Sequence, residues 1–330
     1  MEERSGNKRL FEALSLSVDD IVSSRLIRHI DEEITTAALL GAMASNIAWA
    51  SALALDADLP PFSWVHYSKH NKKEESEAYT GADFSLIFRM DDNKYRAAVF
   101  QAKRAQNNEG KFKYCQISPT RAGYPPEPQI LRLHKYGLKI LATEAQDKEQ
   151  KSDEEHLITK GLDFVHYLIY HQKNAYASAL CDHQNVIDRI QTEAANIQPE
   201  DPNSLESVKK AWNHFAHLTL NPSESTVSLR RLFWNAFSTP ATERAAGWID
   251  LETPAAAGLF ISETRRLMDV FEASDLATPK PTYDGGMDLG GMANKRRPLL
   301  RTVFPKLSAQ PQPQPQPQPV SIIRKARNGP

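Results

Sequence analysis

TGADFSLIFRMDDNKYRAAVFQAKRAQ, residues 80–106, is the stretch that decides the fold. Apolar and other residues alternate from Phe84 to Phe88, and this period of two predicts a strand. A second run rich in β-forming residues extends from Tyr95 to Lys103. The polar residues 91–94, Asp-Asp-Asn-Lys, favour a chain reversal between the two runs. The stretch therefore predicts two antiparallel strands joined by a turn.

Three polar side chains on this hairpin are expected to lie close together. Gln101 and Lys103 are two residues apart, so both side chains leave the same face of the sheet. If the two strands pair, Asp83 at the start of the first lies near the end of the second. A carboxylate, an amide and an ammonium group would then converge on one spot.

This arrangement resembles the PD-(D/E)XK nuclease superfamily, in the variant whose last motif is Gln-x-Lys. The matching residues are Gly81-Ala82-Asp83 and Gln101-Ala102-Lys103. The resemblance implies an α/β fold with a restriction-endonuclease-like central mixed β-sheet flanked by helices, here with a mainly helical C-terminal extension. It also implies a DNA endonuclease of the restriction or phage-defence kind. Because the motif is short, a chance meeting of Asp, Gln and Lys stays open.

The helical pattern of residues 19–55 carries the acid that the resemblance requires. Asp19 or Asp20 is a plausible cap. Glu33 shares one face with a set of mostly apolar residues, where an uncompensated carboxylate is costly; the set is Ile30, Ile34, Ala37, Gly41 and Ala44. Superfamily members carry a helical glutamate before the hairpin, and Glu33 is the matching position, whereas Glu32 falls on the more polar side. The alternative is that Glu33 lies at the edge of the stripe and pairs with Arg28 or a lysine.

The resemblance assigns each of these residues a role in catalysis. Glu33, Asp83 and Gln101 would hold Mg²⁺ or Mn²⁺, and Lys103 would position or activate the attacking water or stabilise charge in the transition state. Because Gln101 offers only a neutral oxygen, we expect weaker metal binding than with an acid, and one ion rather than two. The alternative is a nuclease fold without cleavage that serves as a nucleic-acid-binding or assembly module.

The chain from residue 19 onward is expected to divide into three parts. Residues 19–175 form the nuclease-like core, in which a helix over 129–141 and a buried strand over 164–170 follow the hairpin. Residues 176–273 form a mainly helical extension or complete the core. We expect residues 274–330 to form a flexible basic tail whose Gln-Pro tract favours extended polyproline II, and this tail could contact a protein partner.

Local charge points to a polyanionic partner although the formal net charge is only −1. Between residues 101 and 140 basic side chains outnumber acidic ones, and five of them are candidates for nucleic-acid contact: Arg104, Lys111, Lys113, Arg132 and Lys135. An ordinary solvated surface is the competing interpretation. DNA is the expected nucleic acid, and a homodimer would make it easier to cut both strands.

Composition agrees with an ordinary globular protein, at 330 residues, 41% hydrophobic and 25% charged. The sequence has no apolar run of membrane-spanning length, its first residues are too charged for a signal peptide, and it contains only two cysteines. We therefore expect a cytoplasmic protein without a membrane partner.

Overall fold

The structure is a computed structural model that describes residues 3–24, 31–53, 62–66, 80–90, 94–108, 111–116, 127–147, 161–171, 174–197, 200–201, 204–215, 218–221, 225–253, 255–258, 260 and 269–272. The basic tail, including its Gln-Pro tract, lies outside these residues, so the expectations for residues 274–330 stay predictions.

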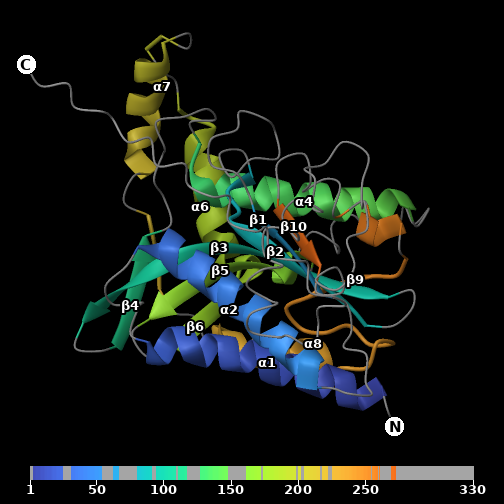
Figure 1. Cartoon of the computed structure of the whole chain (residues 1–330). Coiled ribbons are helices and arrows are strands. Elements are labelled where there is room, and N and C mark those ends of the chain that lie inside the picture. Colours follow the sequence, from blue (N-terminus) through green and yellow to red (C-terminus); the bar gives the residue numbers. More distant parts are fainter. Residues whose placement is uncertain are drawn as a thin grey trace, which may run out of the picture.

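A mixed β-sheet forms the centre of the molecule (Figure 1). Its strands follow the order β10-β1-β2-β3-β5-β6-β8, with bounds β10 Asp269–Glu272, β1 Phe62–His66, β2 Phe84–Arg89, β3 Tyr95–Asn108, β5 Val165–His171, β6 Asn174–Ala179 and β8 Val227–Ser228. Strands β4, β7 and β9 pair beside this path, over Lys111–Gln116, Thr219–Leu220 and Ile249–Leu251. β3 and β5 run parallel, whereas the other neighbours are antiparallel. The predicted α/β class with a mixed sheet is therefore confirmed.

Helices cover both faces of this sheet (Figure 1). Helices α1, α2 and α8, over Glu3–Ser23, Glu32–Leu53 and Leu229–Ser238, pack on one face. Helices α4 and α6, over Gln129–Asp147 and Gln184–Ala194, pack on the other. The short helix α7, Leu205–Trp212, begins at the cap Ser204, whose hydroxyl accepts from the backbone N–H of Ser207. Single-turn helices η2, η3 and η4 occupy Gly161–Phe164, Leu180–His183 and Asn213–Phe215.

The predicted hairpin is confirmed. β2 and β3 pair antiparallel with Phe84 opposite Phe100, and the N–H of Asp83 donates to the carbonyl oxygen of Phe100 at 2.8 Å. β5, the predicted buried strand, is buried along its whole length and lies parallel to β3. Its two covered faces explain its continuous aromatic and β-branched composition.

The N-terminal region differs from the single predicted helix. α1 and α2 are separate helices, and Asp19 and Asp20 lie inside α1 instead of capping a helix start. A helix begins closer to the N-terminus than expected because buried residues recur along α1 at spacings of three and four. These residues are Leu10, Ala13, Leu14, Val18 and Ile21. The amide of Asn46 in α2 donates to Ser17 and Asp20 of α1 and ties the two helices together.

The segment from 176 to 273 is less helical than expected, because it also supplies strands. β6 and β8 extend the sheet beyond β5, and β10 pairs with β1 at the opposite edge. These three strands are two to six residues long, too short to show a clear alternation in the sequence. This segment belongs to the same sheet as the hairpin.

No helix in the described ranges combines the length and the apolar character that crossing a bilayer requires.

Burial of a histidine in the central strand β5 makes stability dependent on pH. His166 is 2% exposed, its Nε2 lies 2.8 Å from the carbonyl oxygen of Gly247, and burial lowers its pKa from 6.5 to about 4. Between these two pH values the unfolded state binds the proton and the folded state does not. We therefore expect the free energy of unfolding to fall by roughly 3 kcal/mol as pH drops from 6.5 to 4, as measured by urea denaturation at several pH values.

The matched variant is His166→Gln, which keeps an N–H donor but does not titrate. Its stability should depend less steeply on pH over the same window. Burial raises the pKa of Asp163, which acts in the opposite direction in both proteins. An equal slope in the variant and the wild type would exclude His166 as the cause.

Candidate active site

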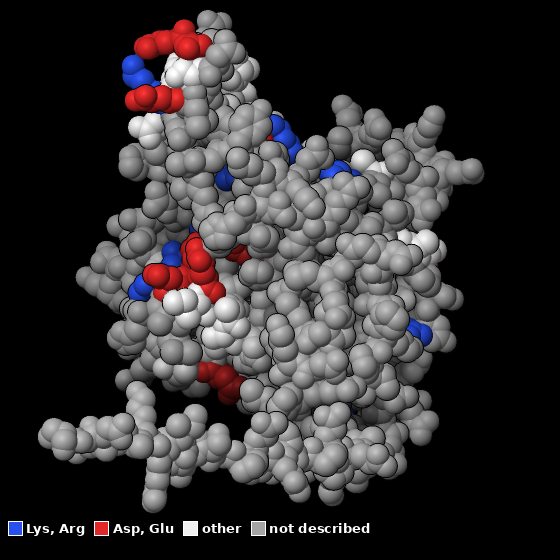
Figure 2. Space-filling view, turned by 45° about the horizontal axis from the view of Figure 1, so that its top comes forward, with Lys and Arg blue, Asp and Glu red and all other residues white. Residues whose placement is uncertain are grey.

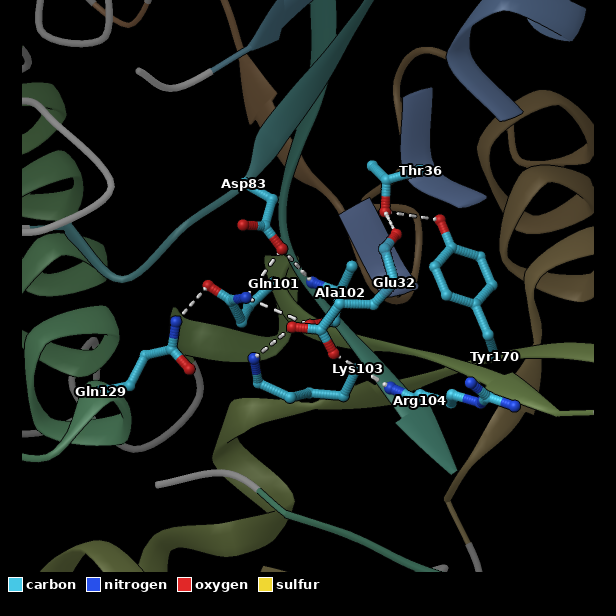
Figure 3. A network of polar contacts seen from close by, with 9 residues as sticks. All are labelled: Glu32, Thr36, Asp83, Gln101, Ala102, Lys103, Arg104, Gln129 and Tyr170. Carbon is cyan, nitrogen blue, oxygen red and sulfur yellow. Dashed lines mark hydrogen bonds and ion pairs between the residues drawn. The ribbon is translucent and has the colours of Figure 1, made fainter. Parts of the chain in front are cut away.

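Polar side chains from four separate segments meet where β3 passes the start of β2 (Figure 3). Asp83 precedes β2, Gln101 and Lys103 project from β3, Glu32 begins α2, and Gln129 begins α4. Gln101 and Lys103 are 1% and 6% exposed. Charged and amide groups this far from water need partners, so the network between them defines the chemistry of the site.

Asp83 meets Gln101 as the sequence predicted. Its Oδ2 accepts two hydrogen bonds of 2.7 Å, one from Nε2 of Gln101 and one from the backbone N–H of Ala102. The bond from the Ala102 N–H requires the carboxylate to lie directly beside the backbone of β3. The antiparallel register therefore fixes the position of Asp83 through main-chain contacts as well as through Gln101.

The helical acid that meets Lys103 is Glu32, and the expectation that Glu33 lies on the buried stripe is wrong. Oε1 of Glu32 lies 3.1 Å from Nζ of Lys103, and its Oε2 accepts from the N–H of Arg104 at 3.2 Å. Glu33 is exposed, and Ile34 beside it is 56% exposed. Any part that Glu33 plays in metal binding stays a prediction.

Two threonines of α2 explain why Glu32, and not Glu33, lies on the helix face that packs against the sheet. Thr35 and Thr36 are buried, and their hydroxyls donate to backbone carbonyl oxygens one turn earlier, those of Asp31 and Glu32. With their polar groups satisfied, the threonines can face the sheet together with the apolar residues Leu39, Leu40, Met43 and Ile47. Glu32 shares this face because it lies one turn before Thr36.

Among the residues that the structure describes, acidic side chains gather on the surface where α2 begins (Figure 2). Asp31 and Glu33 are exposed and Glu32 is partly exposed, and the basic residue Arg104 is exposed as well. An acidic surface favours cations and opposes polyanions. Any approach of a phosphate to this side therefore depends on cationic groups close to the site.

Gln129 is a member of the site that the sequence did not single out. It is 4% exposed, and its Nε2 donates to Oε1 of Gln101 at 2.8 Å. Its own Oε1 is buried and accepts no hydrogen bond within the structure as described. The signal available in the sequence was a polar residue at the first position of a predicted helix, followed by the apolar residues Ile130 and Leu133. Both of these residues are fully buried in the structure.

A neutral tyrosine supports the back of the site. The hydroxyl of Tyr170 in β5 donates to Thr36 at 3.0 Å. Burial raises the pKa of Tyr170 well above its ordinary value, and the nearby carboxylates of Asp83 and Glu32 raise it further. Tyr170 therefore stays protonated near neutral pH and holds α2 against the sheet instead of acting as a base.

The candidate nucleic-acid-binding residues do not form one surface. Arg104 and Lys135 are exposed, and Lys135 pairs with Glu127. Arg132, expected to face outward, is 3% exposed, because its spacing of three from Gln129 turns it toward the sheet. Lys111 and Lys113 lie in β4, but their side chains are outside the described part of the structure.

The oxygen atoms around Gln101 offer a test of whether Mg²⁺ fits. Nε2 of Gln101 lies 2.7 Å from Oδ2 of Asp83 and 3.1 Å from the carbonyl oxygen of Ala102. If the amide were reversed, its Oε1 would take the place of Nε2 beside these two oxygen atoms, and the site would offer three oxygen donors. Mg²⁺ and Mn²⁺ prefer such donors. The residues therefore fit the ion when the Gln101 amide is reversed.

Gly81 allows the hairpin and α4 to approach each other. Its φ is +70°, and an added Cβ would lie 2.8 Å from the backbone oxygen of Gln129. We expect Gly81→Ala to lower the free energy of unfolding by about 2–4 kcal/mol, through left-handed strain and overpacking. Urea denaturation measures the effect.

The matched control is Gly41→Ala in α2, where an added Cβ would meet nothing within 4 Å. Alanine there should stabilise the protein by about 0.5–1 kcal/mol, because it favours the helix. Similar effects of the two substitutions would contradict the proposed close approach at Gly81.

Comparison with known proteins found no matching family model, and neither curated proteins nor solved structures gave a match. The assignment of function therefore depends on the geometry of the site.

Proposed function

We propose that this protein is a metal-dependent nuclease that hydrolyses phosphodiester bonds, with DNA as the substrate. The observation that carries the proposal is the meeting of Asp83, Gln101 and the Lys103–Glu32 pair around the end of the hairpin. The order of elements supports a restriction-endonuclease-like arrangement: the antiparallel strands β1 to β3 and the short strand β4 are followed by helix α4 and then by β5, which lies parallel to β3. A role in restriction or phage defence belongs to the same proposal and rests on the resemblance alone.

Each residue has a task that follows from its position. Asp83 supplies the negative charge that attracts the cation, and the Ala102 N–H fixes its carboxylate. The Lys103 ammonium, which is almost fully buried, would orient the attacking water or stabilise the charge that develops on the phosphate. Glu32 holds that ammonium in place. Bound Mg²⁺ would contribute Lewis acidity.

A specific observation favours the alternative, a nuclease fold that binds nucleic acid or a partner protein without cleaving. Oδ2 of Asp83 already accepts two hydrogen bonds from neutral N–H groups, and Lys103 is already paired with Glu32. A network whose charged groups are satisfied in this way can be structural. The neutral Gln101 in place of an acid points in the same direction.

The deciding experiment incubates the purified full chain with supercoiled plasmid and Mg²⁺ or Mn²⁺, with and without a chelator. We expect metal-dependent nicking that is lost in Asp83→Asn and strongly reduced in Glu32→Gln. Glu33→Gln changes the neighbouring, exposed carboxylate on the same helix turn and tests the metal ligand that the sequence predicted. Because Glu32 is the acid that pairs with Lys103, we expect this variant to cleave as the wild type does, and a loss equal to that in Asp83→Asn would restore Glu33 as a ligand.

Two results would overturn the nuclease proposal. Equal nicking by wild type and Asp83→Asn would indicate a contaminating enzyme. DNA binding in a gel-shift assay without any cleavage, unchanged by Asp83→Asn, would favour the binding module.

A further inference from the structure

The side-chain amides of Gln129 and Gln101 form a directed chain of hydrogen bonds that ends on Asp83 (Figure 3). Nε2 of Gln129 donates to Oε1 of Gln101 at 2.8 Å, and Nε2 of Gln101 donates to Oδ2 of Asp83 at 2.7 Å. Each amide presents its N–H group toward the carboxylate. This direction suits the ionised carboxylate of Asp83, which can only accept hydrogen bonds.

The other end of the chain is an acceptor without a hydrogen bond. Oε1 of Gln129 is buried and has no partner within the described structure, although Gln129 is only 4% exposed. Buried acceptors of this kind are uncommon and call for a reason. Figure 3 shows this oxygen turned toward the side of the network where the Lys103 side chain lies.

We propose that Gln129 is a positioning residue that sets the orientation of Gln101, and that the two amides reverse together when a divalent cation binds at Asp83. The inference rests on the proposed metal-dependent function. After reversal, Oε1 of Gln101 faces Asp83 and the carbonyl oxygen of Ala102. Nε2 of Gln101 then donates to Oε1 of Gln129, the oxygen that has no hydrogen-bond partner among the described residues before the reversal.

The cation is what decides between the two directions. Nε2 of Gln101 lies within hydrogen-bonding distance of two oxygen acceptors, Asp83 Oδ2 and the Ala102 carbonyl. Without a positive charge, an Oε1 in that position would face only other oxygens and repel them. With a cation present, the same three oxygens become ligands. The bond between Gln101 and Gln129 is retained in both directions, so the reversal exchanges partners and breaks no link.

Reversal also changes what Gln129 offers on the Lys103 side. The buried oxygen is replaced there by Nε2, which is a donor. A donor on that side of the network suits an anionic phosphate oxygen. Cation binding would thereby prepare the site for the substrate, and Gln129 would link the two events.

The closing experiment measures Mn²⁺ binding by calorimetry at mildly alkaline pH, with the full chain and no DNA. Gln129→Glu can only accept from Gln101, so it holds Oε1 of Gln101 toward Asp83. We expect binding about tenfold tighter than in wild type. Since the added charge also attracts the cation, the same substitution is made in a Gln101→Met background, where the gain should fall to about twofold.

A second measurement does not depend on Gln129→Glu folding. In protein labelled with ¹⁵N-glutamine, two side-chain amide signals are identified by their loss in Gln101→Met and in Gln129→Met. Both should shift with one common midpoint during a Mg²⁺ titration of the wild type.

Equal gains in the two backgrounds, or a shift of the Gln101 signal alone, would overturn the paired reversal and leave the nuclease proposal standing. Absence of Mn²⁺ binding by the wild type would overturn both. Both the reversal and the nuclease proposal would be supported by three results together. Asp83→Ala should lose Mn²⁺ binding, the affinity gain from Gln129→Glu should depend on Gln101, and the two amide signals should shift with one midpoint.

Discussion

Replacing Lys103 with methionine is expected to lower the rate of metal-dependent DNA cleavage by about 10²- to 10⁴-fold. The ammonium is the cationic group of β3 that projects on the same face as Gln101, and it is 6% exposed. Methionine retains an unbranched apolar side chain of similar length, so the packing beside the sheet is kept while the charge and its three N–H donors are removed. Single-turnover cleavage of a short duplex measures the chemical step.

The loss should reflect chemistry and not unfolding. The partner Glu32 is 32% exposed and keeps its hydrogen bond from the N–H of Arg104, so no isolated charge is left in a dry environment. Thermal unfolding should show a modest change. Lys210→Met is the matched control, because this lysine is exposed on α7 and pairs with Glu200. A Lys103→Met protein that cleaves as fast as the Lys210→Met protein would exclude a catalytic role.

Replacing Arg96 with methionine is expected to lower the free energy of unfolding by about 4 kcal/mol. Arg96 lies in β3 and is fully buried. Its guanidinium donates to Asp250 in β9 and to four backbone carbonyl oxygens at and after the end of α8, those of Ala236, Thr239, Pro240 and Glu243.

The size of this effect follows from the number of acceptors. The C-terminal carbonyls of a helix lack partners within the helix, and here one side chain satisfies that of Ala236 together with three carbonyls that follow the helix. Its removal leaves these acceptors and the Asp250 carboxylate without their donor. Arg96→Lys should recover only part of the loss, because an ammonium has three donors and no planar fork. Urea denaturation gives the free energies.

Arg189→Met on α6 is the control for loss of an arginine without a buried network. Arg189 is exposed and pairs with Glu193 one turn away, so the change should stay within about 0.5 kcal/mol. Equal effects at Arg96 and Arg189 would show that the carbonyl contacts of Arg96 contribute little. Because α8 packs on the same sheet face as α1 and α2, the Arg96 variant should also loosen that layer, as hydrogen exchange would report.

The hairpin was predictable from the sequence because its information is local. Strand period, turn residues and pairing register all lie within residues 80–106, and an antiparallel register of neighbouring strands fixes which residues oppose each other. The contact between Asp83 and Gln101 follows from that register.

The choice between Glu32 and Glu33 could not be made from the sequence. α2 carries apolar residues around most of its circumference, so the period of hydrophobic residues does not select one face. The buried face includes Thr35 and Thr36, whose hydroxyls bond to the helix backbone. A sequence pattern treats these residues as polar, although the helix itself satisfies them.

Arg132 illustrates the same limit on the other face of the sheet. Its charge predicted an outward position, yet it is buried on α4 beside Gln129. A helix that begins at a site in the sheet can direct polar residues inward when they find partners there. Which face of α4 packs against the sheet depends on residues in distant parts of the chain, and the local pattern does not contain that information.

The sequence by itself determined the β2–β3 hairpin and the contact between Asp83 and Gln101, because strand period and chain reversal are properties of neighbouring residues. Only the tertiary structure decided that Glu32 meets Lys103, that Gln129 closes the network, and that Arg96 holds the end of α8. Each of these contacts joins segments distant in sequence. Their formation depends on which helix face packs against the sheet, and that choice is made by packing between segments that lie far apart in the sequence.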